Sequence, residues 1–202
     1  MKLAMLVALA ALCAAGPGLA QTRPPAAPAN ERPPMPPTRD AVLGYHVLPG
    51  AGEAIDVRVT IRAGGRGLRM DLPDQTYMIA QPETRSVALV VPLERTVADL
   101  PWEAGPQPLF LLDERMGFTR KNEATIAGQR CTQWEGALDK ARTLVCVTAD
   151  GLVLRQQFQD PQGRRNLVEA FVVQFDPARE SDFVVPTGFD RLLAGPRPAA
   201  AP

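Results

Sequence analysis

The sequence has 202 residues with 22 basic and 22 acidic side chains, a length typical of one folded domain. A formal charge of zero excludes the dense positive field that nucleic-acid binding requires, and an aromatic content of 5% disfavours base stacking. The single histidine excludes metal sites built from two histidines and leaves acid–base catalysis without its commonest participant. We therefore expect no enzyme activity, no cofactor and no bound metal.

The N-terminus has the pattern of a secretory signal peptide. Lys2 supplies the positive start, an apolar run extends from Leu3 to Ala15, and small residues end it at Ala20. The run is shorter than the roughly 20 residues that cross a bilayer as a helix. We expect cleavage after Ala20, a periplasmic mature protein and no remaining transmembrane span.

The composition then divides the chain into a leader, a domain and a tail. Residues 21–40 contain seven prolines and lack a periodic apolar pattern, which is typical of a stiff, disordered spacer. The tail over 195–202 has the same character. Residues 41–194 between them are expected to fold as one domain, which we expect to be monomeric.

Short β-rich runs follow one another through the domain, separated by Pro, Gly and Asp residues. The alternation of Val57, Val59 and Ile61 with charged and polar residues indicates a half-buried strand. Residues 92–108 carry several prolines and are expected to be irregular, while 109–116 and 189–193 are expected to form short covering helices. The predicted strands cover 42–48, 54–63, 67–72, 76–81, 85–91, 117–126, 129–136, 142–149, 152–159 and 164–175.

Asp150-Gly151 is the strongest turn signal in the chain and predicts a hairpin with a two-residue type I′ turn. This turn would place Val147 opposite Leu154 and Val145 opposite Gln156. Because side chains alternate along a strand, the register predicts a single apolar face. The members of that face are Val145, Val147, Leu152, Leu154 and Phe158.

Two cysteines, Cys131 and Cys146, remain after the predicted cleavage, and they fall on successive predicted strands. An oxidising compartment would join them if the fold brings them together. Direct pairing across the ladder satisfies disulfide geometry and would place Trp134 opposite Thr143. We therefore predict a structural disulfide on the face opposite Trp134, since the chain has no C-x-x-C motif for redox chemistry.

Several segments resemble a known family. They are Ala127-Gly128 before Cys131, the run Val145-Cys146-Val147-Thr148-Ala149-Asp150-Gly151, and the closing stretch with Phe183, Pro186 and Phe189. These segments are similar to bacterial envelope proteins of the DUF4412 kind, which resemble the LolA/LolB-like lipoprotein carriers. The resemblance implies a mainly β fold, a single curved antiparallel sheet that forms an incomplete barrel, with one or two short helices over its concave side.

Two non-enzymatic functions are expected, and the resemblance implies the first of them. In the first, the half-barrel binds an acyl chain or a lipid-modified partner in its concavity. In the second, the concavity is filled by the chain itself and the domain is a structural or interaction module of the envelope. The residues expected to line an apolar ligand site are Trp134, Val145, Val147, Leu152, Leu154 and Phe158.

Overall fold

The computed structural model describes residues 31–50, 52–105, 107–138, 141–159 and 165–193. The predicted signal peptide, the first half of the leader and the tail over 195–202 lie outside these residues. In the part that is described, no helix has the length and apolar character needed to cross a membrane.

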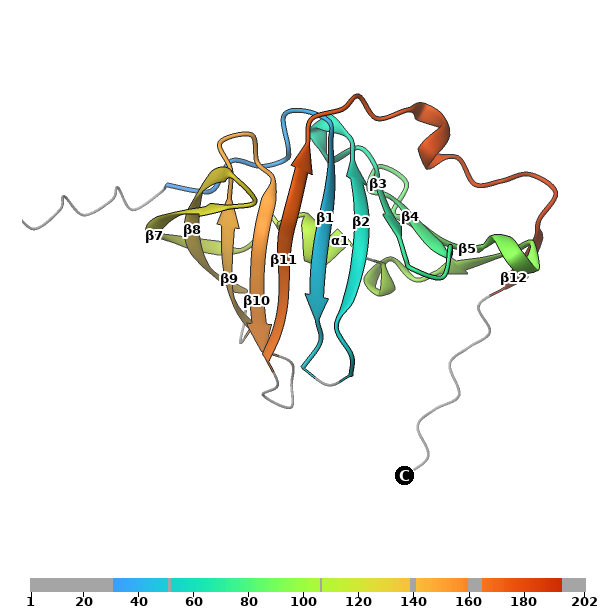
Figure 1. The fold of residues 1–202 in the computed structure, drawn as a ribbon, viewed down its shortest axis with the longest axis horizontal. Helices are drawn as coiled ribbons and strands as arrows, with labels where there is room; N and C mark the ends of the chain where they lie inside the picture. Colours follow the sequence, from blue (N-terminus) through green and yellow to red (C-terminus); the bar gives the residue numbers. More distant parts are fainter. Residues whose placement is uncertain (1–30, 51, 106, 139–140, 160–164, 194–202) are drawn as a thin grey trace, which may run out of the picture.

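One open 12-stranded sheet contains all the strands of the described residues (Figure 1). Its order is β12-β6-β5-β4-β3-β2-β1-β11-β10-β9-β8-β7. Short helical turns and α1, Gln107–Phe110, lie in the connections. The strands are β1 Ala41–Leu48, β2 Ile55–Ile61, β3 Leu68–Asp71, β4 Tyr77–Gln81, β5 Ser86–Val91, β6 Thr96–Leu100, β7 Gly117–Ile126, β8 Gln129–Leu138, β9 Ala141–Val147, β10 Val153–Gln159, β11 Arg165–Gln174 and β12 Asp190–Leu193.

The sheet consists of two meanders that meet where β1 pairs with β11. One meander runs from β1 to β6, and the other runs from β7 back to β11. The segment between β6 and β7 must therefore run across one face of the sheet, from near one edge to the opposite edge. It carries α1 behind β11 and β1 (Figure 1). The fold class is confirmed: the protein is mainly β, with an open, curved sheet and little helix.

The crossing segment fills the face of the sheet that it covers. Phe110 of α1 is fully buried, and its ring centroid lies 4.8 Å from that of Tyr45 on β1. Tyr45 is itself buried and donates a hydrogen bond from its hydroxyl to the carbonyl oxygen of Val153 at 2.7 Å. Leu43 and Val59 belong to the same core cluster. We call this face of β1–β3 the inner face and the opposite one the outer face.

The helices are where the sequence prediction was least accurate. The helix expected over 109–116 starts earlier and ends at Phe110. Asp113 ends any continuation, because its carboxylate accepts a hydrogen bond from the backbone N–H of Arg115 at 2.8 Å and so stabilises a turn. The second expected helix, over 189–193, is also wrong, since Asp190–Leu193 forms β12, which pairs in parallel with β6. Strand β6 itself lies inside the stretch that was expected to be irregular.

The β9–β10 hairpin has a three-residue loop, so the predicted type I′ turn is wrong. The N–H of Gly151 donates to the carbonyl of Thr148 at 3.0 Å, and only Gly151 of the turn has a positive φ, at 82°. Val147 therefore lies opposite Val153 rather than Leu154. A bulge at Leu154 then restores the predicted register, with Gln156 opposite Val145.

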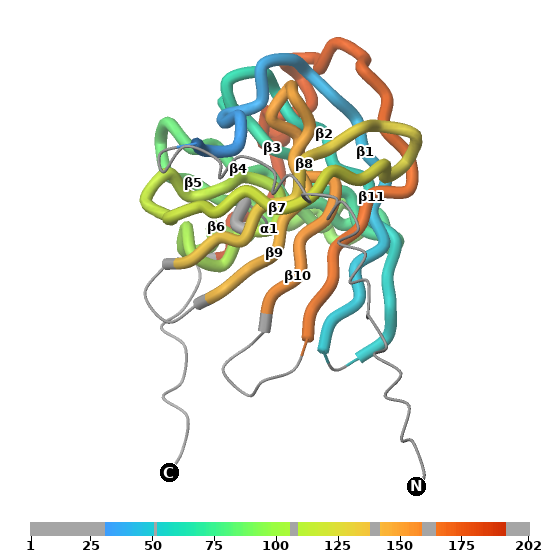
Figure 2. The backbone as a smooth tube through the Cα atoms, turned by 90° about the vertical axis from the view of Figure 1, so that its left-hand side faces the viewer, coloured from blue at the N-terminus to red at the C-terminus, as the bar shows by residue number. Residues whose placement is uncertain are grey.

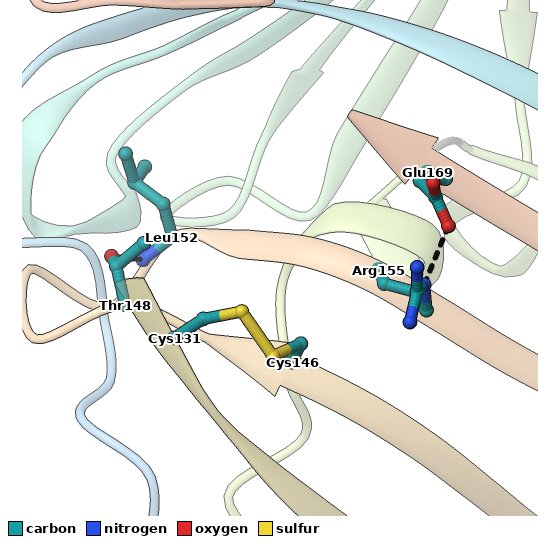
Figure 3. The surroundings of a disulfide bond; sticks show 6 residues. All are labelled: Cys131, Cys146, Thr148, Leu152, Arg155 and Glu169. Atoms are coloured by element: carbon teal, nitrogen blue, oxygen red, sulfur yellow. Dashed lines mark hydrogen bonds and ion pairs between the residues drawn. A yellow bond between two sulfur atoms is a disulfide. The ribbon is translucent and has the colours of Figure 1, made fainter. Parts of the chain in front are cut away.

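The predicted disulfide between Cys131 and Cys146 is present, with its Cα atoms 5.5 Å apart (Figure 3). Its register differs from the expected one, because Gln133 lies opposite Cys146 and Trp134 lies opposite Val145. The cysteines are thus diagonal neighbours. A shift of two residues preserves the face of every side chain, which explains why the disulfide still lies on the face opposite Trp134.

The described part of the leader, residues 31–40, packs along the domain and differs from the disordered spacer that its composition predicts. Pro33 and Pro37 are buried. The carbonyl of Pro37 accepts a hydrogen bond from Gly64 at 2.6 Å, and Thr38 donates one to Asp150 at 2.8 Å. In Figure 2 this segment (blue) runs beside the turn between β9 and β10 (orange).

Candidate functional site

The six residues predicted to line a ligand site are divided between different surroundings. Leu152 and Leu154 are fully buried in the main core cluster, together with the disulfide. Trp134, Val145 and Val147 form a second cluster with Val153, Leu112 and Phe118. The single apolar face expected from the hairpin register is therefore wrong, because the bulge at Leu154 changes the alignment of β10 on β9.

Phe158, the sixth residue, is only half-buried. It lines a hollow of ≈ 390 Å³ at the ends of β9, β10 and β11, where Leu144 and Leu167 add apolar surface. Two side-chain atoms in this half of the sheet, Trp134 Nε1 and Gln156 Oε1, are buried and make no hydrogen bond among the described residues.

A further surface site lies on the outer face of β11, β1, β2 and β3, a region that the sequence analysis did not assign. Two adjoining hollows of ≈ 890 Å³ and ≈ 490 Å³ share Val42, Arg58 and Asp71 in their linings. We call the two together the outer groove. In Figure 1 the outer face of these strands faces the viewer, and the connection from β11 to β12 (red) runs above β3 and β4.

The larger hollow is charged and lies between the sheet and the β11–β12 connection. Arg69 pairs with Asp71 at 2.7 Å, lies 3.8 Å from the ring centroid of Tyr77, and donates to the carbonyl of Asp182 at 3.4 Å. Burial raises the pKa of the Tyr77 hydroxyl, so this ring stays neutral beneath the guanidinium. The remaining charged groups of the lining are Arg58, Asp176, Arg179 and Asp182.

Asp40 holds the β11–β12 connection in place above this hollow. Its carboxylate accepts hydrogen bonds from the backbone N–H groups of Ala63 at 2.8 Å and Ala178 at 2.9 Å. These bonds, with the first from Ala63 the largest cause, lower the pKa of Asp40 and keep it ionised. Ala178 is part of the lining, so Asp40 fixes one wall of the outer groove.

The smaller hollow is apolar. A bulge between β1 and β11 leaves Phe171 as an extra residue, and its ring covers Gly44 so closely that a Cβ there would lie 2.6 Å from Cζ of Phe171. Phe171 and Val172 remain 46% and 39% exposed. The His46 ring stacks on Phe171 at 4.4 Å, and its Nδ1 lies 2.5 Å from a carboxylate oxygen of Asp56. Asp56 lies ten residues along the chain and reaches His46 only across the β1–β2 ladder, so the sequence alone does not reveal this pair.

Within the described ranges, no group of three or more His, Cys, Asp or Glu residues is arranged to hold a metal ion. The outer groove instead combines arginine and aspartate side chains with an exposed aromatic ring, a combination suited to binding another molecule.

These features define the class of the molecule as a half-barrel built from one open, curved sheet. No family model matches the sequence, and no curated protein matches it either. The DUF4412 assignment therefore stays a prediction.

Among solved structures, an uncharacterized conserved protein from Thermus thermophilus superposes with a TM-score of 0.55 at 12% identity, covering 77% of this chain and 91% of that one. MucB superposes with a TM-score of 0.54 at 9% identity, covering 75% of this chain, which spans 59% of MucB. The Pseudomonas aeruginosa MucA/MucB complex also matches, with a TM-score of 0.50 at 11% identity over 73% of this chain and 56% of that one. A LolA superfamily protein from Nitrosomonas europaea matches with a TM-score of 0.42 at 8% identity, over 74% of this chain and 91% of that one. At these identities the similarity concerns the fold alone.

Proposed function

We propose that the protein is an exported, non-enzymatic interaction module of the bacterial envelope that binds a partner protein. The observation that carries this proposal is the filled inner face. Phe110 is fully buried against Tyr45, and Leu152 and Leu154 are also fully buried. Because the side chains already pack, an acyl chain could enter this face only by displacing the crossing segment.

The surface supports the same proposal. The outer groove offers exposed apolar and charged side chains, whereas Leu43 and Tyr45 on the inner face are buried in the core cluster that contains Phe110. A structural neighbour supports it at the level of analogy, because MucB has been solved in complex with MucA. Export to the periplasm rests on the signal pattern over residues 1–20.

Mass spectrometry of the protein purified from periplasm tests this function. We expect a mature chain that begins at Gln21, is two hydrogens lighter than the reduced form and carries no acyl species before solvent extraction. The mass deficit reports the disulfide, and the starting residue reports the cleavage. A stoichiometric acyl species in the native spectrum that disappears on extraction would contradict the proposal.

A second candidate function is binding of a small apolar ligand, and the hollow beside Phe158 favours it. Its volume of ≈ 390 Å³ and its lining of Leu144 and Leu167 suit a short acyl segment. Phe158 is the predicted ligand residue that combines an aromatic ring with partial exposure. A fluorescent fatty acid bound by the wild type and lost in Phe158→Asp would support this candidate.

A further inference from the structure

We propose that the outer groove binds an extended peptide segment of a partner protein, in which a carboxylate side chain stands close to an apolar one. The inference rests on the proposed function and names the chemistry of its partner. It follows from the shape of the groove, from two arginine side chains in it that make no ion pair with any described residue, and from the apolar surface at one end.

The shape favours an extended chain. The groove crosses β11, β1, β2 and β3, and neighbouring strands lie about 4.8 Å apart, so it spans about 14 Å. An extended peptide advances about 3.3 Å per residue and would cover this distance with four or five residues. The β11–β12 connection forms a wall beside this path.

The unpaired side chains of the lining specify a carboxylate. Arg69 and Asp71 neutralise each other, and the carboxylate of Asp182 is engaged by the backbone N–H of Arg179, from which it accepts a hydrogen bond. Among the described residues, neither Arg58 nor Arg179 has an ion-pair partner for its guanidinium group. The lining thus holds as many aspartates as arginines, but the hydrogen-bond donors of the Arg58 and Arg179 guanidinium groups are not taken up by an ion pair among the described residues and can bind a carboxylate of another molecule. An arginine fork binds a carboxylate through two parallel hydrogen bonds.

The position of Arg58 also indicates where the apolar side chain of the bound peptide would lie. In the ladder it lies between Gly44 and Asp71, and it lines both hollows. The neighbouring position on the Gly44 side has no side chain of its own and is covered by the exposed ring of Phe171, which lines the smaller hollow together with Arg58. A peptide whose carboxylate reaches Arg58 would therefore place a neighbouring apolar side chain on Phe171 and Val172. Exposed aromatic residues of this kind are typical anchors at protein interfaces.

Selection of peptides tests the proposal directly. Phage-displayed random peptides of about ten residues are selected on the mature chain, and the affinity of an enriched peptide is measured by calorimetry. We expect enriched sequences to carry Asp or Glu within a few residues of a branched aliphatic or aromatic residue. Arg58→Glu should weaken binding by at least about tenfold, because it replaces a charged hydrogen-bond donor with a like charge.

Two matched variants complete the design. Arg130→Glu makes the same charge change at an 87% exposed side chain on β8, outside the groove, and should leave the affinity unchanged. A peptide with Lys in place of its acid should bind Arg58→Glu better than it binds the wild type. Phe171→Ser should also weaken the enriched peptide, with its fold checked by thermal melting.

Each contrary result overturns the proposal. Enriched peptides without carboxylates, or equal affinities for the wild type and Arg58→Glu, would show that Arg58 does not recognise the partner. Binding to phosphatidylglycerol vesicles that Arg58→Glu abolishes, with no peptide enriched, would assign the groove to an anionic lipid surface. An acyl species in the native mass spectrum would overturn the proposed function itself, so the two failures are distinguishable.

Discussion

Truncation of Phe110 provides the sharpest test of the filled inner face. The side chain is fully buried and forms a tilted aromatic pair with Tyr45 at 4.8 Å. A buried Phe→Ala substitution costs about 3–5 kcal/mol, because it removes buried apolar area and leaves a cavity. The lost aromatic pair alone accounts for about 0.5–1.5 kcal/mol. We therefore expect Phe110→Ala to lower the free energy of unfolding by about 3–5 kcal/mol.

Urea unfolding followed by tryptophan fluorescence measures this effect, and thermal melting provides a second readout. For a domain of this size, a loss of that magnitude lowers Tm by on the order of 10 °C. Leu93→Ala is the control, because Leu93 is 76% exposed and should cost less than about 0.5 kcal/mol. A loss below about 1 kcal/mol for Phe110→Ala would refute the reasoning. The crossing segment would then be a removable cover, and the acyl-binding function would regain support.

Three further substitutions test other parts of the fold. Cys131→Ser should lower the free energy of unfolding by about 3 kcal/mol, since the disulfide closes a loop with a sequence separation of 15; equal melting of the wild type with and without a reductant would contradict this. Gly151→Ala should lower the free energy of unfolding more than Gly128→Ala does. Limited proteolysis should also cut the leader faster in Gly151→Ala than in Gly128→Ala. Both glycines have a positive φ, but only at Gly151 would a Cβ meet the backbone of Pro34 and Pro36, at 3.1 Å, so equal effects would exclude leader packing as the cause. Asp40→Asn should be less stable than the wild type at pH 7, and the difference should shrink as the pH falls below 3.8. Folding lowers the pKa of Asp40, so the ionised carboxylate stabilises the fold at any pH above its pKa in the unfolded chain. This stabilisation is lost as the pH falls through the pKa of the folded state. A stability difference between Asp40→Asn and the wild type that stays constant between about pH 7 and pH 3 in urea unfolding would contradict this prediction.

Local patterns in the sequence predicted most of the strands. The alternation around Val57 and Val59 correctly predicted that their side chains lie in the core. Alternate residues of a strand point to the same face of the sheet, and this face of the strand packs in the core. Strand β6 was missed because Pro92 and Pro101 suggested an irregular segment. Pro101 in fact directly follows the strand and Pro92 belongs to the turn before it, so neither proline removes an N–H from the β6 ladder.

Errors of register came from single residues that local patterns do not reveal. The Asp150-Gly151 pair was read as the centre of a two-residue turn, but only Gly151 adopts a positive φ, so the loop has one residue more. The bulge at Leu154 compensates for the extra residue within the same hairpin. Pairs beyond the bulge were therefore predicted correctly, whereas Val147 and Leu154 were placed on a common face that does not exist.

The outer groove depends on contacts between distant segments, and this explains why the sequence did not reveal it. Arg58 and Phe171 line one hollow only because β1 pairs with both β2 and β11, which brings together the two ends of the folded chain. One local signal was present, since an isolated glycine inside a strand indicates a bulge or a close approach. Gly44 has both: the bulge on β11 and the Phe171 ring above it. A glycine on the solvent face of a central strand therefore indicates where an aromatic side chain from a distant segment can pack. In this protein, Gly44 lies at the boundary between the charged and apolar halves of the groove.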